Sequence, residues 1–328
     1  MSVGTLSVIL PTYNCRSLII RSLKEASNWL DLADEIIVVD SFSTDGTLEL
    51  IKQELRHPNL KIISRERGLY ESWNEAIRLS RRDWVYISTA GDTIKRSHLQ
   101  HLIETGCRLQ ADIVVSNARF LTDDGSPCPT RVWPSRKLIR AFRIMAPTVL
   151  PPSTTQYFAF SAYPLAILGS AAANIYRGEH LRARPFPLDH GHSGDAAWML
   201  RYAHETRLCL TPHEGATFLV HNKEAATDPL DCGALLTKEI GNVQRSGDAG
   251  EWLRMFVEQE LPLVLAGQSL RSRLRQQPNR ELPTVTKLGQ RAWIHLLLRQ
   301  QRVRLFFCQL RIRRKIRARM ALAPDQRP

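Results

Sequence analysis

The sequence has few cysteines, and their spacing fits neither a metal site nor a disulfide framework. The six cysteines of this 328-residue chain stand alone, without a C-x-x-C pair: Cys15, Cys107, Cys128, Cys209, Cys232 and Cys308. Zinc sites need closely spaced ligands, and small disulfide-stabilised domains need a dense, paired set. Both classes are therefore excluded, and the isolated thiols predict a reducing compartment such as the cytoplasm.

Export and membrane-spanning signals are also lacking. A strand-like run, Leu6–Leu10, arrives where a signal peptide would need a charged start and a longer apolar core. One uncharged stretch, Ile144–Tyr176, is long enough to cross a bilayer. Four prolines and the polar residues between them nevertheless argue against a single spanning helix. We expect buried or substrate-facing loop and strand there, with a membrane-dipping loop as the alternative.

Acidic residues are nearly absent from the C-terminal segment. Residues 271–328 hold sixteen Lys or Arg and two acids, whereas the rest of the chain is close to neutral. A long basic helix, Leu288–Met320, is expected because apolar residues recur near helical spacing. Together with interspersed aromatics, it predicts contact with an anionic membrane surface. The alternatives are a helix packed on the rest of the protein and, least favoured, nucleic-acid binding, because no recognition motif accompanies the charge.

The first 116 residues alternate between strand-like and helix-like segments. The expected strands are Leu6–Leu10, Glu35–Asp40, Leu60–Ser64, Trp84–Ile87 and Asp112–Ser116, and the expected helices are Arg16–Leu30, Asp45–Leu55, Leu69–Leu79 and Ser97–Leu109. Such alternation indicates parallel βαβ units and an α/β fold. Further on we expect strands at Gly169–Tyr176, Leu208–Leu210 and Thr217–Val220, helices at Gly194–His204 and Ala249–Leu265, and a linker at Ser269–Pro283.

Polar side chains follow three of the expected strands. Tyr13 comes after the first strand, Asp40 ends the second, and Asp92 follows the fourth. In a parallel α/β sheet, ligands bind beyond the carboxyl ends of the strands. There an aromatic ring can stack on a base, an acid can hydrogen-bond a ribose, and a carboxylate can hold a divalent cation. The set predicts a nucleotide site, although each residue alone is also explained as a turn or helix-cap residue.

Five segments in this order resemble the family 2 glycosyltransferases, which have the GT-A fold. They are LSVILPTYN (Leu6–Asn14), EIIVVDSFSTDGT (Glu35–Thr47), RGLYESWNEAI (Arg67–Ile77), WVYISTAGD (Trp84–Asp92) and GDAAWMLR (Gly194–Arg201). The resemblance implies a Rossmann-like, mixed but mostly parallel sheet flanked by helices over residues 1–222. Residues 1–116 would bind the nucleotide sugar and 117–222 the acceptor. A helical extension (223–270), a linker (271–287) and the basic amphipathic helix and tail (288–328) would follow.

The resemblance also implies residues that contact the donor. Pro11 and Tyr13 would frame the nucleobase, and Asp40 would hydrogen-bond the base or ribose. The segment after the third strand, with Gly68, Tyr70 and Asn74, would line the donor side. An ordinary amphipathic helix explains that segment equally well.

The family's acidic metal motif falls on residues 89–92. Thr89 falls at the first acid of that motif and Gly91 at its middle position, and both would line the donor site here. Asp92 would then hold a divalent cation, Mn²⁺ or Mg²⁺, with His221 close to the metal and diphosphate. The cation would act as a Lewis acid on the leaving group.

Asp195 falls where the family has its catalytic base, at the start of a helix. A helix N-terminus favours the ionised carboxylate that a base requires. The acid that usually precedes it is replaced by Gly194. Trp198, one turn further on, is expected as a wall for a sugar or as a core residue. His190 and His192 lie in a loop that could close over the acceptor.

The resemblance predicts an inverting glycosyltransferase of bacterial surface polysaccharide synthesis. The donor would be a nucleotide-diphosphate sugar, with a UDP-sugar favoured, and the acceptor a saccharide or lipid-linked hydroxyl. The location would be cytoplasmic or peripheral at the inner face of the cell membrane. A sugar nucleotidyltransferase is a rival, but such enzymes usually have a Gly-rich loop with Arg and Lys after the first strand. A catalytically inactive sugar-nucleotide-binding or scaffold protein is the other rival, supported by the missing acids at Thr89 and Gly194.

Overall fold

A twisted eight-stranded sheet forms the centre of the computed structural model, which describes residues 4–128, 132–220, 232–276 and 284–322. The strand order is β3-β2-β1-β4-β9-β6-β10-β8. The strands are β1 (Leu6–Thr12), β2 (Glu35–Asp40), β3 (Leu60–Ser64), β4 (Trp84–Ile87), β6 (Ile113–Val115), β8 (Thr148–Val149), β9 (Asn174–Arg177) and β10 (Leu208–Leu210). Strand β9 runs antiparallel to β4 and β6, and β8 runs antiparallel to β10, whereas the other neighbours are parallel. The predicted mixed, mostly parallel sheet is confirmed.

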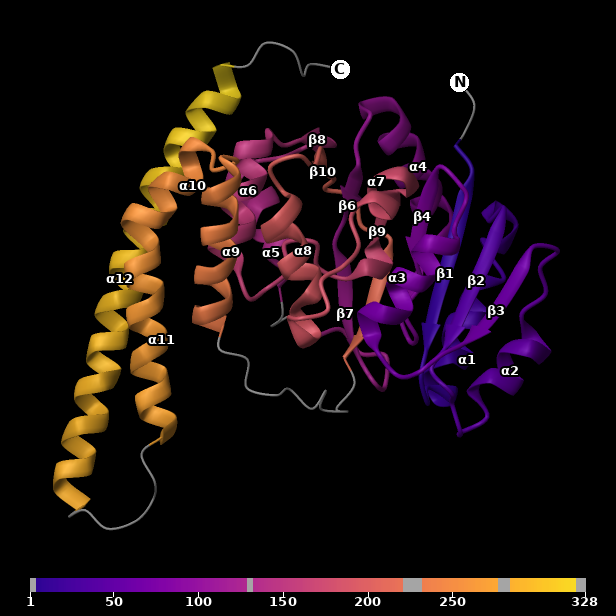
Figure 1. Ribbon diagram of the computed structural model, residues 1–328, viewed down its shortest axis with the longest axis horizontal. Coiled ribbons are helices and arrows are strands. Elements are labelled where there is room, and N and C mark those ends of the chain that lie inside the picture. The colour runs from indigo at the N-terminus through magenta and orange to yellow at the C-terminus, as the bar shows by residue number, and fades with distance from the viewer. Residues whose placement is uncertain (1–3, 129–131, 221–231, 277–283, 323–328) are drawn as a thin grey trace.

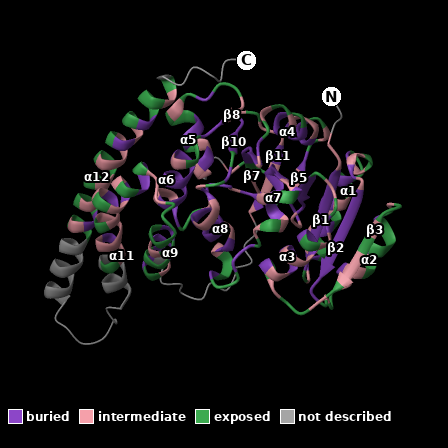
Figure 2. Ribbon diagram, turned by 45° about the horizontal axis from the view of Figure 1, so that its top comes forward, coloured by how far each residue is buried: buried purple, intermediate pink, exposed green. Residues whose placement is uncertain are grey.

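Helices cover both faces of this sheet (Figure 1). The helices of the first half are α1 (Arg16–Ala26), α2 (Thr47–Glu54), α3 (Leu69–Leu79) and α4 (Arg96–Leu109). Alternate residues of β1 enter different cores: Ile9 packs with α3, whereas Val8 and Leu10 pack with α1 and α4. This follows from the two-residue repeat of a strand. Because both faces are buried, the central strands are mostly apolar, and burial is nearly continuous along them (Figure 2).

Most predicted element bounds of the first half are confirmed within a few residues. The first strand extends two residues further than expected, through Pro11 to Thr12. Strand β4 pairs with β1 only as far as Ile9, so the missing N–H of Pro11 falls beyond the end of that ladder. The first helix is shorter than predicted and ends at Ala26, with a separate 3₁₀ turn, η1 (Leu30–Leu32), before β2.

A second, three-stranded sheet lies beside the main one. It has the order β5-β11-β7 and consists of β5 (Thr93–Ile94), β7 (Ala118–Thr122) and β11 (Ala216–Val220). Strand β11 pairs antiparallel with β5 and parallel with β7. Because β5 follows Asp92 directly, this small sheet fixes the loop that the metal motif was predicted to occupy.

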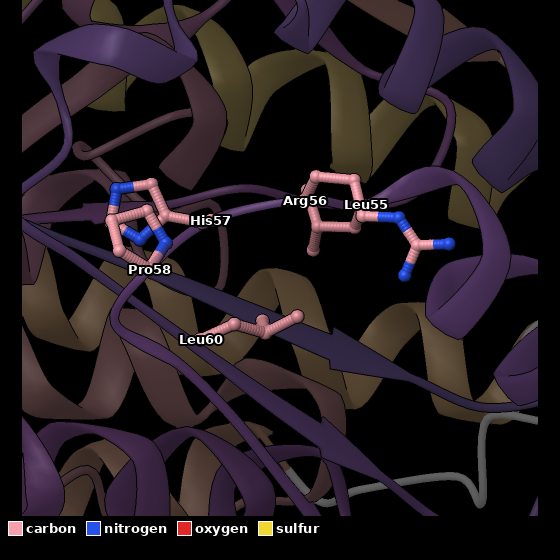
Figure 3. A pocket seen from close by; sticks show the side chains of 5 residues that line it. All are labelled: Leu55, Arg56, His57, Pro58 and Leu60. Atoms are coloured by element: carbon pink, nitrogen blue, oxygen red, sulfur yellow. The ribbon is translucent and has the colours of Figure 1, made fainter.

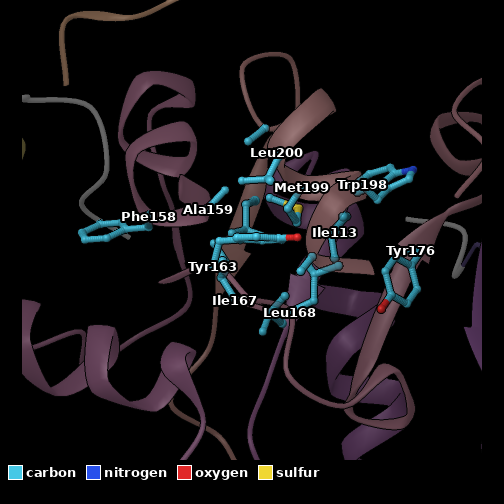
Figure 4. Close-up of a cluster of buried hydrophobic side chains, with 14 of the residues drawn as sticks. Ile113, Phe158, Ala159, Tyr163, Ile167, Leu168, Tyr176, Trp198, Met199 and Leu200 are labelled. Carbon is cyan, nitrogen blue, oxygen red and sulfur yellow. The ribbon is translucent and has the colours of Figure 1, made fainter. Parts of the chain in front are cut away.

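The uncharged stretch Ile144–Tyr176 contains a helix where loop and strand were predicted. Helix α6 (Pro152–Ala162) begins with its proline in the first turn, where the missing N–H has no consequence. It is surrounded by core on all sides, so its sequence shows no amphipathic period (Figure 4). The buried Gln156 side chain donates to the carbonyl of Asp248 and accepts from the amide of Gly250. Burial was predicted correctly, but the element type was wrong.

Helix α6 is joined by further short helices around the second half of the sheet. These are α5 (Pro134–Phe142), η2 (Ala171–Ala173), α7 (Gly178–Ala183), η3 (Gly191–Ser193) and α8 (Gly194–Tyr202). The strand predicted at Gly169–Tyr176 is shorter, because η2 occupies its first half and β9 only the end.

The C-terminal region is helical. It comprises α9 (Cys232–Ser246), α10 (Glu251–Met255), the π-helical turn η4 (Phe256–Glu260), α11 (Leu261–Gln276) and α12 (Thr284–Leu322). Helix α11 continues to residue 276 and α12 starts at 284, so much of the predicted linker at 271–287 is helix instead. The two helices lie side by side at the edge of the molecule away from β1–β3 (Figure 1). Among the described residues, no helix is both long and apolar enough to cross a membrane.

Candidate active site

The loops after β1 and β2 are locked together at the carboxyl edge of the sheet. The Thr12 hydroxyl donates to Asp40 Oδ1 at 2.8 Å, and the Ser43 hydroxyl donates to the same oxygen at 2.6 Å. The Ser43 amide donates to Asp40 Oδ2 at 2.8 Å. Asn14 accepts from the Thr44 amide at 2.8 Å. The fully buried Asp40 therefore braces both loops, and its predicted contact with a base or ribose stays a prediction.

The same edge exposes aromatic rings beside an arginine. Tyr13 is 41% exposed, and Phe42 on the neighbouring loop is 55% exposed. The Arg67 guanidinium lies 4.4 Å from the centre of the Tyr13 ring. Sequence reasoning missed Phe42 and Arg67 as site residues. The signal available for Arg67 was its place at the start of the third motif, directly after β3; Phe42 is marked only by its backbone, with φ of 51°.

The Asp92 carboxylate points into the protein. Its Oδ2 accepts the Thr89 hydroxyl at 2.6 Å and the Ser170 hydroxyl at 3.2 Å, and its Oδ1 accepts the Leu219 amide at 3.0 Å. Only 6% of the residue is exposed. Burial raises the pKa of Asp92 to about 6, and these donors lower it only in part. Asp92 thus joins the end of β4 to β11.

The described residues do not fit a divalent cation held by Asp92. A hard cation takes several oxygen ligands, and carboxylates supply them best. At this loop the fold offers one carboxylate, whose two oxygens are already occupied by three donors. Gly91, with φ of +91°, has no side chain to add, and Thr89 turns its hydroxyl to Asp92. The predicted ligand His221 lies outside the described residues, and we assign no chemical step to a metal here.

A second group of possible ligands, Asp189, His190 and Glu239, is an ion-pair cluster. Their ligand atoms lie within 4.8 Å of one another. The Arg201 guanidinium, however, donates to Glu239 at 2.8 Å and to Asp189 at 3.0 Å, and the Lys238 ammonium donates to Asp189 at 2.9 Å. Two cations already neutralise the acids, so a metal ion would meet repulsion. The cluster ties α9 to the loop before α8, and His190 is buried in it rather than facing an acceptor.

Asp195 lies at the start of α8 and is held by Tyr70. The Tyr70 hydroxyl lies 3.1 Å from Asp195 Oδ1 and 3.1 Å from the His192 carbonyl, so it can donate to either oxygen. The Ala196 amide also donates to Oδ1, at 2.8 Å. Among the described residues, no hydrogen bond from another residue reaches Asp195 Oδ2, which leaves this oxygen available to accept a proton. Burial raises the pKa of Asp195 to about 6, against the lowering effects of the Ala196 amide, the Tyr70 hydroxyl and the residue's own amide.

Tyr70 connects Asp195 with the donor-side loops. It is the second residue of α3, which begins directly after Gly68. Three residues earlier, Arg67 covers Tyr13. The segment from Arg67 to Tyr70 therefore joins the edge of the sheet that carries Tyr13 to the acid at the start of α8. The third and fifth motifs meet here, although more than a hundred residues separate them.

Gly194 and Asn74 explain how this contact is built. A Cβ atom at Gly194 would lie 2.5 Å from the Tyr70 ring and 2.9 Å from the Pro187 carbonyl oxygen. The acid that the family usually has at Gly194 is therefore incompatible with Tyr70 in this position. Asn74 donates to the Phe186 carbonyl and accepts its amide, both at 2.8 Å. It thus holds the loop before α8 rather than exposing its amide.

Trp198 is a core residue rather than a sugar-stacking wall. It has no exposed surface, and its indole N–H donates to the Arg184 carbonyl at 2.6 Å. Figure 4 shows it among other buried side chains of this core. A hollow lined by Leu55, Arg56, His57, Pro58 and Leu60 lies before β3, at the amino end of that strand (Figure 3). The donor-side loops follow the carboxyl ends of the strands, so this hollow is not part of the site.

The fold and these contacts define a class of protein, an α/β domain built to receive a nucleotide-linked substrate at the carboxyl edge of its sheet. The family model "Glycosyl transferase family 2" matches residues 7–169. The chain belongs to this family of glycosyltransferases.

Two curated relatives match parts of the chain. The chain is 25% identical over 150 residues to the succinoglycan biosynthesis protein ExoO of Rhizobium meliloti, covering 45% of this chain and 42% of that protein. It is 33% identical over 85 residues to chondroitin synthase of Escherichia coli, covering 25% of this chain and 12% of that protein. The matched regions span less than half the length of these relatives.

Two solved structures share the fold across most of this chain. S. aureus TarS 1-349 in complex with UDP-GlcNAc has a TM-score of 0.56 at 17% identity, covering 96% of this chain and 92% of that chain. The mannosyltransferase PcManGT from Pyrobaculum calidifontis, in complex with GDP-Man and Mn²⁺, has a TM-score of 0.53 at 19% identity, covering 94% and 87%.

Proposed function

We propose that this protein is an inverting glycosyltransferase in which Asp195 is the catalytic base. The observation that carries the proposal is the hydrogen bond between Tyr70 and Asp195. It brings an acid, one oxygen of which accepts from no other described residue, next to the segment that covers Tyr13. Family membership supplies the reaction class, since the matched family transfers glycosyl groups.

The donor would bind across the loops after β1, β2 and β3. The exposed rings of Tyr13 and Phe42 offer surfaces on which a nucleobase can stack, and Pro11 lies in the same loop. Arg67 supplies positive charge beside Tyr13, where a diphosphate can meet it. The nucleotide sugars named for the solved relatives, UDP-GlcNAc and GDP-Man, support a nucleotide-diphosphate sugar, and we propose a UDP-sugar.

Transfer would proceed by single displacement. Asp195 Oδ2 takes the proton from an acceptor hydroxyl while that oxygen attacks the anomeric carbon, and the bond to the nucleotide diphosphate breaks with its electron pair on the leaving group. A pKa of about 6 suits this role, because the carboxylate is ionised at neutral pH yet remains basic. Gly68, Thr89 and Gly91 stay predictions as donor contacts, and Mn²⁺ or Mg²⁺ stays a prediction as cofactor.

The substitution Asp195→Asn tests the base assignment. Asparagine keeps an oxygen that can accept from Tyr70 and Ala196, so the loop should keep its shape. We expect donor binding, measured by thermal shift with UDP-sugars, to persist while transfer falls by at least about a hundredfold. Turnover near that of the wild type would remove Asp195 from the mechanism. Donor binding without transfer by the wild type towards any hydroxyl acceptor would favour the inactive, sugar-nucleotide-binding alternative.

We further propose a saccharide or lipid-linked acceptor and a place at the inner face of the cell membrane. The polysaccharide-related names of the relatives support the acceptor class. The basic helix α12 supports the location, because each cationic side chain near an anionic lipid surface contributes about 1 kcal/mol of attraction.

A further inference from the structure

Helix α12 presents apolar side chains on two opposite faces. Leu298, Ile312 and Ile316 are buried, with at most 7% of each exposed. Leu296, Val303 and Phe307 are between 46% and 62% exposed. With 3.6 residues per turn, residues 298 and 312 share one face, whereas residues 296, 303 and 307 share the opposite one. The arrangement explains why the apolar residues of α12 do not follow the spacing of a single helix face.

The buried face attaches the helix to the catalytic domain. Ile312 and Ile316 belong to the same hydrophobic core as β1 and α8. Beside them, the Tyr157 hydroxyl on α6 donates to Glu260 at 2.6 Å. Burial raises the pKa of Glu260, and Tyr157, together with Gln309 and Arg313 on α12, lowers it in part. At least one basic side chain of this part of the helix, Arg313, therefore interacts with an acid inside the protein.

The opposite face has no such partner among the described residues. Phe306, at 60% exposed, extends the apolar patch made by Leu296, Val303 and Phe307, and its ring lies 5.6 Å from that of Phe307. We call these four residues the outer patch. Helix α12, which carries this patch, lies with α11 at the edge of the molecule remote from β1–β3 (Figures 1 and 2).

The outer patch is bordered by positive charge alone. The patch is flanked on α12 by the exposed side chains of Arg299, Arg304 and Arg311. The exposed Arg314 lies on the same face as Phe307, about two helical turns further along. The sequence has no acidic residue between Glu281 and Asp325. A protein partner would have to supply many acids to match this border, whereas an anionic bilayer offers both negative head groups and an apolar interior.

We infer that the outer patch is the segment that enters an anionic lipid surface, while residues 309–319 attach the helix to the catalytic domain. The helix lies in the plane of the interface, with Phe306 and Phe307 below the head groups and the arginines among them. The inference rests on the proposed membrane association and specifies which part of α12 performs it. It does not depend on the proposed base.

Vesicle flotation of the full chain tests the inference. Wild-type protein is expected to float with vesicles that contain phosphatidylglycerol and to stay at the bottom with pure phosphatidylcholine. The double variant Phe306→Ser/Phe307→Ser keeps every charge and should bind the anionic vesicles at least about tenfold more weakly, because two partly inserted aromatic side chains are lost. Met145→Ser/Leu165→Ser is the matched control, since these residues are also exposed apolar side chains but lie elsewhere. It should float like the wild type.

The outcomes separate the two levels of the proposal. If the wild type does not float with anionic vesicles, the membrane association itself fails. If the wild type and the Phe306/Phe307 variant float equally well, membrane association depends on charge alone, and insertion of the outer patch is excluded. If the wild type forms a concentration-dependent dimer by light scattering that the variant abolishes, and neither floats, a second copy of this chain covers the patch instead. Donor binding measured in parallel shows whether each variant is folded.

Discussion

The hydroxyl of Tyr70 lies 3.1 Å from Asp195 Oδ1, joining the first turn of α3 to the first turn of α8. Tyr70 is almost fully buried and stacks on Phe186, with the ring centres 5.6 Å apart. The ring is therefore fixed, and with it the oxygen that faces Asp195. A tyrosine held in this way orients a carboxylate and tunes its basicity at the same time.

Tyr70→Phe should shift the pH profile of transfer. The Tyr70 hydroxyl lowers the pKa of Asp195, so its removal should raise that pKa above about 6 and move the acidic limb of kcat/KM to higher pH. We also expect kcat at neutral pH to fall about tenfold, since a hydrogen bond to a charged group is lost. Tyr157→Phe is the control, because the hydroxyl of this buried tyrosine donates to Glu260 and not to Asp195. An unchanged acidic limb would contradict the role of Tyr70.

Asp195→Asn should stabilise the fold at neutral pH. The pKa of Asp195 is raised from 3.8 to about 6 in the folded protein. Between these pH values the folded protein keeps a proton on Asp195 that the unfolded chain has already released. Stability therefore falls as pH rises through this window, and the deficit remains above it. We expect the variant to melt roughly 2–4 °C higher than the wild type at pH 7 and at the same temperature below pH 4. Equal melting temperatures at both pH values would contradict the raised pKa.

Gly194→Ala should displace Tyr70 or destabilise the protein. The added methyl group would lie 2.5 Å from the Tyr70 ring, which packs against Trp73 and Phe186 and therefore cannot move freely. We expect a loss of about 1–3 kcal/mol in the free energy of unfolding, measured by urea titration. Gly241→Ala on α9 is the control, since its nearest neighbour is the end of the flexible Arg245 side chain. It should be neutral or slightly stabilising.

Asp92→Asn should leave any metal dependence unchanged. The Asp92 side chain already accepts three hydrogen bonds inside the fold, so its oxygens are directed at protein donors rather than at the donor site. We expect transfer by the wild type and the variant to respond identically to added Mn²⁺ after treatment with a chelator. A rise of about tenfold in the Mn²⁺ concentration needed by the variant would identify Asp92 as a ligand after all.

Much of the donor half was readable from sequence because its signals are local. The runs LSVILPT and EIIVVD are apolar over Val8–Pro11 and Ile36–Val39, as expected for strands buried on both faces, and Leu69–Leu79 has the spacing of a helix packed on one side. Asp45 was expected as a helix-start residue, and its carboxylate accepts the Thr47 amide at 3.0 Å. In these segments local propensity and tertiary packing agree.

Other features had no local signal. Helix α6 is buried on all sides, so no polar face marks its period, and it was taken for loop and strand. The exposed and the core-facing apolar residues of α12 are mixed in sequence because they lie on opposite sides of one helix. An acid in a loop such as Asp92 gives no sign of whether it faces solvent or protein.

The sequence by itself determined the family, the order of the strands and helices in the first half, and the acid at the start of α8, because each depends on residues that are neighbours along the chain. Tertiary structure alone decided that Asp92 turns inward, that Gly194 makes room for Tyr70, and that Trp198 belongs to the core. Those outcomes depend on which side chains from distant segments compete for the same space and the same hydrogen bonds. No pattern within one segment records that competition.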